Sequence, residues 1–213
     1  MRDLPIFTTQ YGVASLTLSE IPYKQEAYIR LQATEEPEKL LEECIAFCRA
    51  CGAERIFATG HLLCEQYSLY TEIWQMRCLI GSLPVTDAAL FPVQEKTLQL
   101  WKDSYNQRMR KVPNAATMTN LTAQALLKEG SGYFVHRGDQ LIGIGKACGD
   151  RIDAVASLVP GYGKDVVCAL SHALSGDCAI VEVASNNIPA ISLYKRLGFI
   201  PVTMIAKWHR VYG

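Results

Sequence analysis

A short glycine-rich segment contains the residues whose types and spacing point most directly to chemistry. Gly161-Tyr162-Gly163 is followed by Lys164 and comes just after Pro160 ends an apolar run. If this loop leads from a strand into a helix, the first N–H groups of the helix stay unpaired at its positive end, where phosphate binds. Glycine allows close approach to an anion, and Lys164 adds a cation. The alternative is an ordinary turn between a strand and a helix.

Cysteines suggest a second kind of chemistry, because Cys44, Cys48 and Cys51 have a spacing that could hold three irons of an iron–sulfur cluster. The same residues, together with Leu41, form the apolar stripe of an amphipathic helix, which favours buried packing thiols. We expect the eight cysteines to be free thiols. No metal site is predicted, because the histidines are scattered without ligand spacing: they are His61, His136, His172 and His209.

The composition indicates a globular protein of one or two domains. The chain has 213 residues, of which 49% are hydrophobic and 20% charged, so disorder is excluded as its main state. Twenty-one basic residues balance twenty-one acidic ones, so neither nucleic acid nor a membrane surface is an expected partner. No apolar stretch approaches the roughly 18 residues that span a bilayer. The N-terminal residues lack an apolar signal segment, and we therefore expect a cytoplasmic protein.

The elements after residue 86 are predicted to follow the order ααβββαβαβ. Two helices come first, then three antiparallel strands, then two helices that alternate with two strands. The predicted ranges are helices over 94–110 and 119–128, strands over 133–136, 140–144 and 151–159, a helix over 164–174, a strand over 179–184, a helix over 188–197 and a last strand over 201–211.

The N-terminal part is predicted to carry strands over 6–16 and 26–31, a helix over 38–50, a buried strand over 54–58 and a helix over 63–76. Gly81 to Asp87 has the composition of a linker, and we place a domain boundary at residue 85. A weak internal repeat supports two related halves, since Ser68-Leu69-Tyr70 recurs as Ser192-Leu193-Tyr194.

A pattern near the C-terminus resembles the GNAT family, the Gcn5-related N-acetyltransferases. The pattern is Asn-x-x-Ala-x-x-Leu-Tyr-x-x-x-Gly-Phe, from Asn187 through Tyr194 to Phe199, after the strand that carries Glu182 and the loop at Gly161. The resemblance covers about residues 86 to 213. It implies an α/β (α+β) fold, with a mixed, mostly antiparallel sheet flanked by helices and preceded by a truncated GNAT-like half, 1–85, that is not catalytic. The last strand of the usual fold is missing, and we expect it from the N-terminal half or from a partner chain in a homodimer.

The resemblance implies acetyl transfer from acetyl-CoA to an amine of a small molecule or a protein, with no metal. Acetyl-CoA would lie between two splayed strands, with its pantetheine paired to the backbone at Leu158 and Val159. Tyr194 would protonate the departing thiolate, Glu182 would act as the base, and Asn187 would touch the cofactor. The N–H groups of the loop would bind the pyrophosphate: they belong to Gly161, Tyr162, Gly163, Lys164, Asp165 and Val166.

Each of these residues also has a purely structural alternative. Asn187 is suited to cap the following helix, Tyr194 lies on an apolar helical stripe, and Glu182 alternates with valines on a strand. Asp153 and a bound water are rival bases. The loop is one residue shorter than the usual family loop, and Asp165 places a negative charge where pyrophosphate would bind. The second hypothesis is therefore a degenerate GNAT fold that binds CoA or another protein without turnover.

Overall fold

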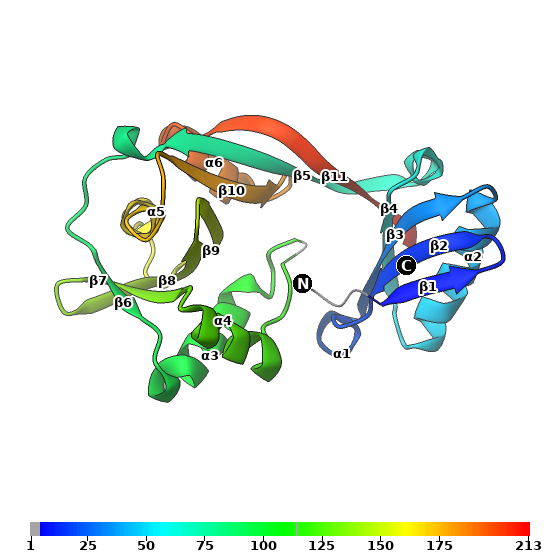
Figure 1. Cartoon of the computed structure of the whole chain (residues 1–213), viewed down its shortest axis with the longest axis horizontal. Helices are drawn as coiled ribbons and strands as arrows, with labels where there is room; N and C mark the ends of the chain where they lie inside the picture. The colour runs from blue at the N-terminus through cyan, green and yellow to red at the C-terminus, as the bar shows by residue number, and fades with distance from the viewer. Residues whose placement is uncertain (1–4, 114) are drawn as a thin grey trace. The chain divides into compact units, whose positions relative to one another are not determined.

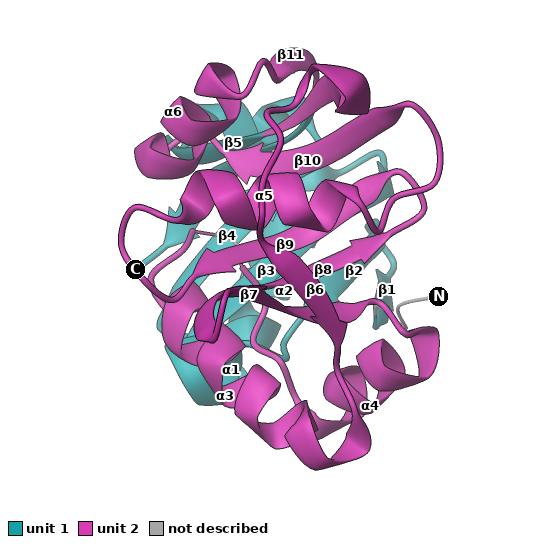
Figure 2. Ribbon diagram, turned by 90° about the vertical axis from the view of Figure 1, so that its left-hand side faces the viewer, with its two compact units in different colours: residues 1–73, 204–213 teal, residues 74–203 magenta. Residues whose placement is uncertain are grey.

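The computed structural model describes residues 5–113 and 115–213, which group into two compact units (Figure 2). Unit 1 comprises residues 1–73 and 204–213, and unit 2 comprises residues 74–203. Residues 1–4, part of the segment examined for an export signal, lie outside the described residues. The predicted boundary at residue 85 stays a prediction.

Unit 2 is a sheet with helices on both faces. Its strands run in the order β6-β7-β8-β9-β10-β5-β11 (Figure 1). The strands are β5 (Ser68–Leu79), β6 (Ala89–Pro92), β7 (Gly132–Arg137), β8 (Gln140–Cys148), β9 (Arg151–Ser157), β10 (Cys178–Ala184) and β11 (Ile200–Tyr212), and the helices are α3 (Leu98–Met109), α4 (Asn120–Glu129), α5 (Gly163–Ser171) and α6 (Ile188–Arg196). Only residues 74–79 of β5 and 200–203 of β11 belong to this unit. The predicted order of elements is confirmed, and the missing strand is β5, which comes from the N-terminal half of the sequence.

Successive side chains of the sheet in unit 2 enter two different cores. Val135 belongs to the cluster under α5 and α6, whereas its neighbour Phe134 belongs to the cluster under α3 and α4, as expected when strand side chains alternate between faces. Helix α5 packs closely on β8 because two positions there lack a side chain. A Cβ at Gly143 would lie 2.3 Å from Val166, and one at Gly145 would lie 2.2 Å from Leu170.

Helix α4 of unit 2 is capped at both ends. The Thr119 side chain accepts a hydrogen bond from the N–H of Thr122, and Gly130 ends α4 in the left-handed conformation. The three antiparallel strands β7, β8 and β9 are also confirmed by their pairing. These features position the loop between β9 and α5 at one end of the sheet.

Unit 1 is a smaller sheet covered by one long helix. Strands β1 (Ile6–Thr9), β2 (Gly12–Thr17), β3 (Glu26–Thr34) and β4 (Arg55–Thr59) are followed in the sheet by β11, and a short helix α1 (Ile21–Lys24) connects β2 to β3. Helix α2 (Pro37–Ala50) buries Cys44 and Cys48 against the strands, so the predicted helical stripe is confirmed at these two residues. Cys51 lies beyond the helix and is exposed, contrary to its predicted burial.

Two predictions for the N-terminal part are wrong. The segment over 6–16 forms two paired strands, β1 and β2. The segment over 63–76 is a short 3₁₀ turn, η1 (Leu62–Gln66), followed by strand β5, and is therefore not a helix. Ile73 and Met76 have helical spacing, yet Thr71 and Ile73, and then Met76 and Cys78, are buried in steps of two. The repeated triplet is consequently a strand in one place and a helix in the other.

Candidate functional site

Strands β9 and β10 separate soon after they begin. They pair in parallel at Ile180 with Arg151 and at Val181 with Ile152, and no later pair joins them among the described residues. Both strands continue for several residues, to Ser157 and Ala184. The facing backbone edges beyond Val181 are therefore free to pair with an extended ligand, which is the kind of opening that the resemblance to the GNAT family implied.

The N-terminal half of the sequence contains a similar parallel pair that stays closed. Strands β3 and β4 pair continuously from Glu26 with Arg55 to Arg30 with Thr59. The ladder uses the backbone groups that would be needed to hold an inserted chain. Only β9 and β10 thus leave an opening of this kind among the described parallel pairs.

The backbone at the end of β9 already has partners within the protein. The N–H groups of Leu158 and Val159 donate to the carbonyl of Ile142, at 2.8 and 3.4 Å. The carbonyl of Leu158 accepts from Arg108 Nη2 at 2.6 Å, and that of Val159 accepts from the Ser157 hydroxyl. A ligand that pairs with these carbonyls must therefore displace or share the contacts of Arg108 and Ser157.

The start of helix α5 presents several unpaired N–H groups. Gly161 has a φ of +91°, a conformation that favours glycine, and a Cβ there would meet no atom within 4 Å. The N–H of Tyr162 donates to Val159 and that of Val166 donates to Tyr162. For the other four residues of the loop, no described residue accepts a hydrogen bond from the N–H group: these are Gly161, Gly163, Lys164 and Asp165.

Charged side chains surround this loop. Asp165 Oδ1 accepts a hydrogen bond from the Thr86 hydroxyl at 3.0 Å, which holds its carboxylate toward the segment before β6. Arg137 lies 5.8 Å from the centre of the Tyr162 ring and forms a 2.9 Å ion pair with Asp87. Lys164 is exposed and has no ion-pair partner in the described ranges. The loop thus combines free N–H donors with one unpaired cation, which suits an anion.

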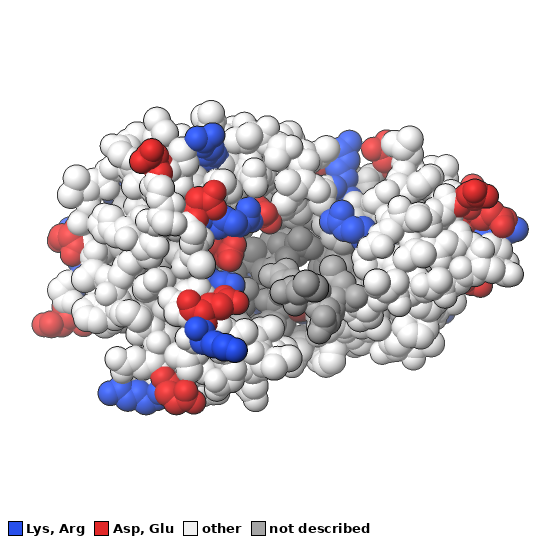
Figure 3. Space-filling model, in the orientation of Figure 1, with Lys and Arg blue, Asp and Glu red and all other residues white. Residues whose placement is uncertain are grey.

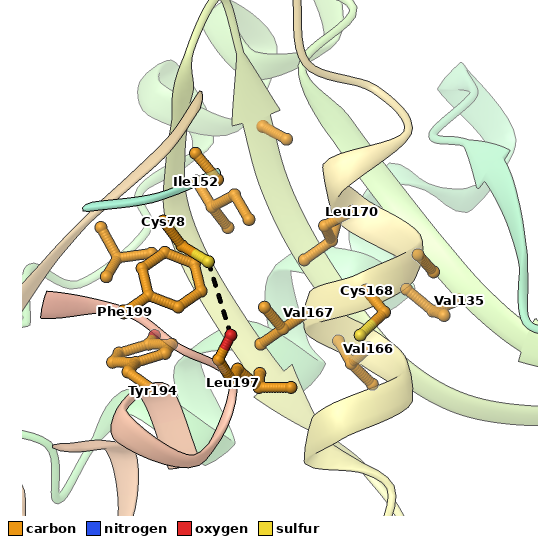
Figure 4. Packing of buried hydrophobic residues seen from close by; sticks show 14 of the residues in the cluster. Cys78, Val135, Ile152, Val166, Val167, Cys168, Leu170, Tyr194, Leu197 and Phe199 are labelled. Atoms are coloured by element: carbon orange, nitrogen blue, oxygen red, sulfur yellow. Dashed lines mark hydrogen bonds between the residues drawn. The ribbon is translucent and has the colours of Figure 1, made fainter. Parts of the chain in front are cut away.

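Tyr194 lies in the core at the end of α6. It is 7% exposed, and its ring centre lies 5.4 Å from that of Phe199. Figure 4 shows the two rings next to each other in the buried cluster. Burial raises the pKa of its phenol to about 12. No described residue forms a hydrogen bond with its hydroxyl. The core role and the acid role are both compatible with this position, because the phenol keeps its proton at neutral pH.

Asn187 and Glu182 each have a structural partner. The Asn187 side chain accepts a 3.4 Å hydrogen bond from the N–H of Ala190, so the predicted cap of α6 is confirmed. Glu182 is 39% exposed and forms an ion pair with Arg151, which also contacts Asp153 at 3.4 Å. Arg151 therefore links β9 to β10 just before they separate. For Glu182 to accept a proton, it must give up part of this ion pair.

Arg108, Arg137 and Arg151 were not identified from the sequence. Each acts on a partner distant in the chain, at Leu158, Asp87 and Glu182, and no local spacing signals such contacts. Over the side of unit 2 drawn in Figure 3, basic and acidic side chains are interspersed, which reflects ion pairs of this kind rather than a surface of one sign.

Neither the cysteines of α2 nor any group of side chains that could bind a metal ion forms a reactive site among the described residues. Burial raises the pKa of the Cys44 and Cys48 thiols to about 12, so both stay protonated. Within residues 5–113 and 115–213, no three His, Cys, Asp or Glu side chains are grouped closely enough to bind a metal ion. Over the same residues, no helix is long and apolar enough to cross a membrane.

Comparisons with known proteins identify the type of fold. Residues 159–208 match the family model of the FR47-like proteins, and this segment contains the loop and Tyr194. No curated protein matches the chain. The match and the structural neighbours below confirm the predicted resemblance to the GNAT family.

Solved structures resemble the whole chain rather than one unit. A functionally unknown conserved protein of Staphylococcus epidermidis has a TM-score of 0.64 at 13% identity, with 99% of this chain and 94% of that one covered. A GCN5-related N-acetyltransferase of Kribbella flavida has a TM-score of 0.58 at 13% identity, over 100% and 91%. A tandem GNAT protein from the clavulanic acid biosynthesis pathway has a TM-score of 0.52 at 10% identity, over 95% and 79%. At these identities the similarity shows the fold alone.

Proposed function

We propose that this chain, which has the GNAT fold and an FR47-like segment, transfers the acetyl group of acetyl-CoA to a primary amine. The proposal rests on two features found together in unit 2. Strands β9 and β10 separate and leave an open backbone edge, and several N–H groups at the start of α5 have no acceptor among the described residues. The opening suits an extended amide chain, and the N–H groups suit a pyrophosphate. Acetyl-CoA contains both groups in one molecule.

The proposed reaction requires two proton transfers, and we assign a residue to each. The attacking amine must lose a proton, and the departing thiolate gains one. We assign the acid role to Tyr194, whose buried phenol is protonated at neutral pH. For the base we assign Glu182, with Asp153 or a bound water as alternatives. Asn187, besides capping α6, would lie at the cofactor, and backbone N–H groups at the strand opening would polarise the thioester carbonyl.

In this proposal unit 1 is not catalytic. Its parallel strands β3 and β4 stay paired throughout. The loop before α2 and the first turn of that helix contain Glu35, Glu36 and Glu38 and have no glycine, so they would repel a phosphate. A second acetyl-CoA site is therefore not expected in this half.

The proposal is tested by titrating the full chain with acetyl-CoA and by measuring thiol release with a panel of primary amines. We expect acetyl-CoA at about 100 times its Kd to stabilise the chain by about 2.7 kcal/mol. An acetyl-pantetheine control, which lacks the pyrophosphate, should bind more weakly. Binding without thiol release on any amine would favour the second hypothesis, a binding module, and absence of both would contradict the GNAT-type function.

Two substitutions at one position separate the charge of the loop from its N–H groups. Lys164→Met removes the cation, which at an exposed site should weaken acetyl-CoA binding by up to about fivefold. Lys164→Pro also removes one N–H donor at a position in the first helical turn where proline is tolerated. We expect it to weaken binding by a further factor of about ten or more, because hydrogen bonds to charged groups contribute about 1.5–3 kcal/mol. Equal affinities for the two variants, measured by calorimetry, would show that the N–H group does not contact the ligand.

The role of Glu182 is tested by comparing Glu182→Gln with Arg151→Met. If Glu182 is the base, Glu182→Gln lowers kcat by about 10²-fold or more, whereas Arg151→Met, which keeps the carboxylate, retains most of kcat. The expected KM for acetyl-CoA is unchanged in Glu182→Gln. If both variants instead raise this KM equally with kcat retained, the pair serves only to hold β9 and β10 together. Asp153→Asn tests the rival base: kcat should be retained if Glu182 is the base and lost if Asp153 is.

A further inference from the structure

Unit 1 contains a pocket that the proposed acetyl transfer does not use. It has a volume of about 280 Å³ and lies at the end of β4, where Thr59, Glu65, Lys207 and His209 contribute to its lining. These residues come from β4, from η1 and from β11, all within unit 1. Strand β11 is fixed beside β4 by the pairing of His209 with Ala58. The walls of the pocket are therefore held by the sheet itself.

His209 contributes a buried nitrogen that has no partner. The residue is 6% exposed, and its Nε2 forms no hydrogen bond with any described residue. Its Nδ1 lies 3.0 Å from the carbonyl oxygen of Tyr67. Because a carbonyl can only accept, Nδ1 must carry the proton, and in the neutral ring Nε2 is then an acceptor. A buried acceptor of this kind requires a donor, and residues 5–113 and 115–213 supply none.

An acidic and a basic side chain line the same pocket as His209. Glu65 Oε1 and Lys207 Nζ lie 3.5 Å apart and are about half and two-fifths exposed. The pocket thus offers two acceptors, His209 Nε2 and the Glu65 carboxylate, and one cation. A simple anion would leave Nε2 without a donor, and a simple cation would face the Lys207 ammonium. A molecule with both an ammonium and a carboxylate matches all three groups.

We propose that this pocket binds a free α-amino acid. Its ammonium donates to His209 Nε2 and to Glu65, and its carboxylate accepts from Lys207. The volume supports a ligand of this size, since pockets for drug-sized molecules begin at about 300 Å³. The site does not depend on the proposed acetyl transfer and gives the N-terminal unit a binding role of its own.

The test uses the full chain and the twenty free amino acids as probes, with binding followed by calorimetry and by the NMR signals of the His209 ring. We expect at least one amino acid to bind and to shift these signals. Its N-acetyl derivative, which lacks the ammonium, and its methyl ester, which lacks the carboxylate, should each bind at least about tenfold more weakly. The binding should be retained in Tyr194→Phe and in the presence of acetyl-CoA, which separates this site from the proposed catalytic one.

Two exposed substitutions avoid disturbing the buried histidine. Glu65→Gln and Lys207→Met should each weaken binding by about tenfold or more. The same changes on the surface of unit 2, Glu95→Gln and Lys128→Met, are the matched controls and should leave affinity unchanged. The proposal is overturned if no amino acid shifts the His209 signals, if the pocket variants bind as well as their controls, or if a crystal structure shows a water on Nε2 that every amino acid leaves in place.

Discussion

Replacing Tyr194 by phenylalanine is expected to lower kcat for acetyl transfer by about 10²–10⁴-fold, the range for loss of a positioned acid. The substitution deletes one oxygen and keeps the ring that packs on Phe199. Since no described residue bonds to the hydroxyl, its loss leaves no protein group without a partner. Acetyl-CoA affinity should therefore change little. The measurement is single-turnover thiol release together with a calorimetric Kd for acetyl-CoA.

The pH dependence of the acetyl-transfer activity is a second test of the role of Tyr194. Burial raises the pKa of the Tyr194 phenol to about 12, so the group remains protonated below that value. Activity should consequently show no alkaline limb from Tyr194 up to about pH 11. Tyr23→Phe, at an exposed position in unit 1, is the matched control and should retain full activity. Equal loss of acetyl-CoA binding and of kcat in Tyr194→Phe would indicate a packing role only.

Local signals in the sequence were sufficient for most of unit 2. Asn187 was suited to cap the helix that follows it, and it caps the start of α6, because caps satisfy backbone groups within a few residues of themselves. The hairpin of β7 and β8 likewise has its turn residues between two alternating runs. Predictions of this kind succeed because the contacts involved are between residues that are close together in the sequence.

The strand β5 could not be predicted in the same way. Ile73 and Met76 are three positions apart, which favours a helix when only the sequence is considered. What makes the segment a strand is its place between β10 and β11, both more than a hundred residues further along the chain. Tertiary pairing of this range overrides local preference.

In the candidate site, too, the features set by neighbouring residues were predicted and those set by long-range contacts were not. The glycines at 161 and 163 and the pattern around Tyr194 identified the loop and helix, since those residues lie together in the sequence. The contacts of Arg108 with Leu158 and of Arg137 with Asp87 were missed. Each depends on elements brought together only by the fold, and each bears on how a ligand could enter.

Leu170→Ala is expected to destabilise unit 2 by about 2–5 kcal/mol, the range for a large-to-small change in a packed core. Leu170 is fully buried on α5, and its side chain fills the space that Gly145 leaves on β8. The glycine has no side chain that could move into the cavity, so little relaxation is available. Because α5 carries the N–H groups of the loop, acetyl-CoA affinity should fall as well.

The measurement is amide hydrogen exchange at increasing urea concentration, which reports the stability of each unit separately. In Leu170→Ala the amides of unit 2 should lose protection before those of unit 1. Leu121→Ala makes the same chemical change at a site that is 82% exposed, where the effect should stay within about 0.5 kcal/mol. A loss for Leu170→Ala no larger than that of this control would show that α5 is not packed on β8 as described.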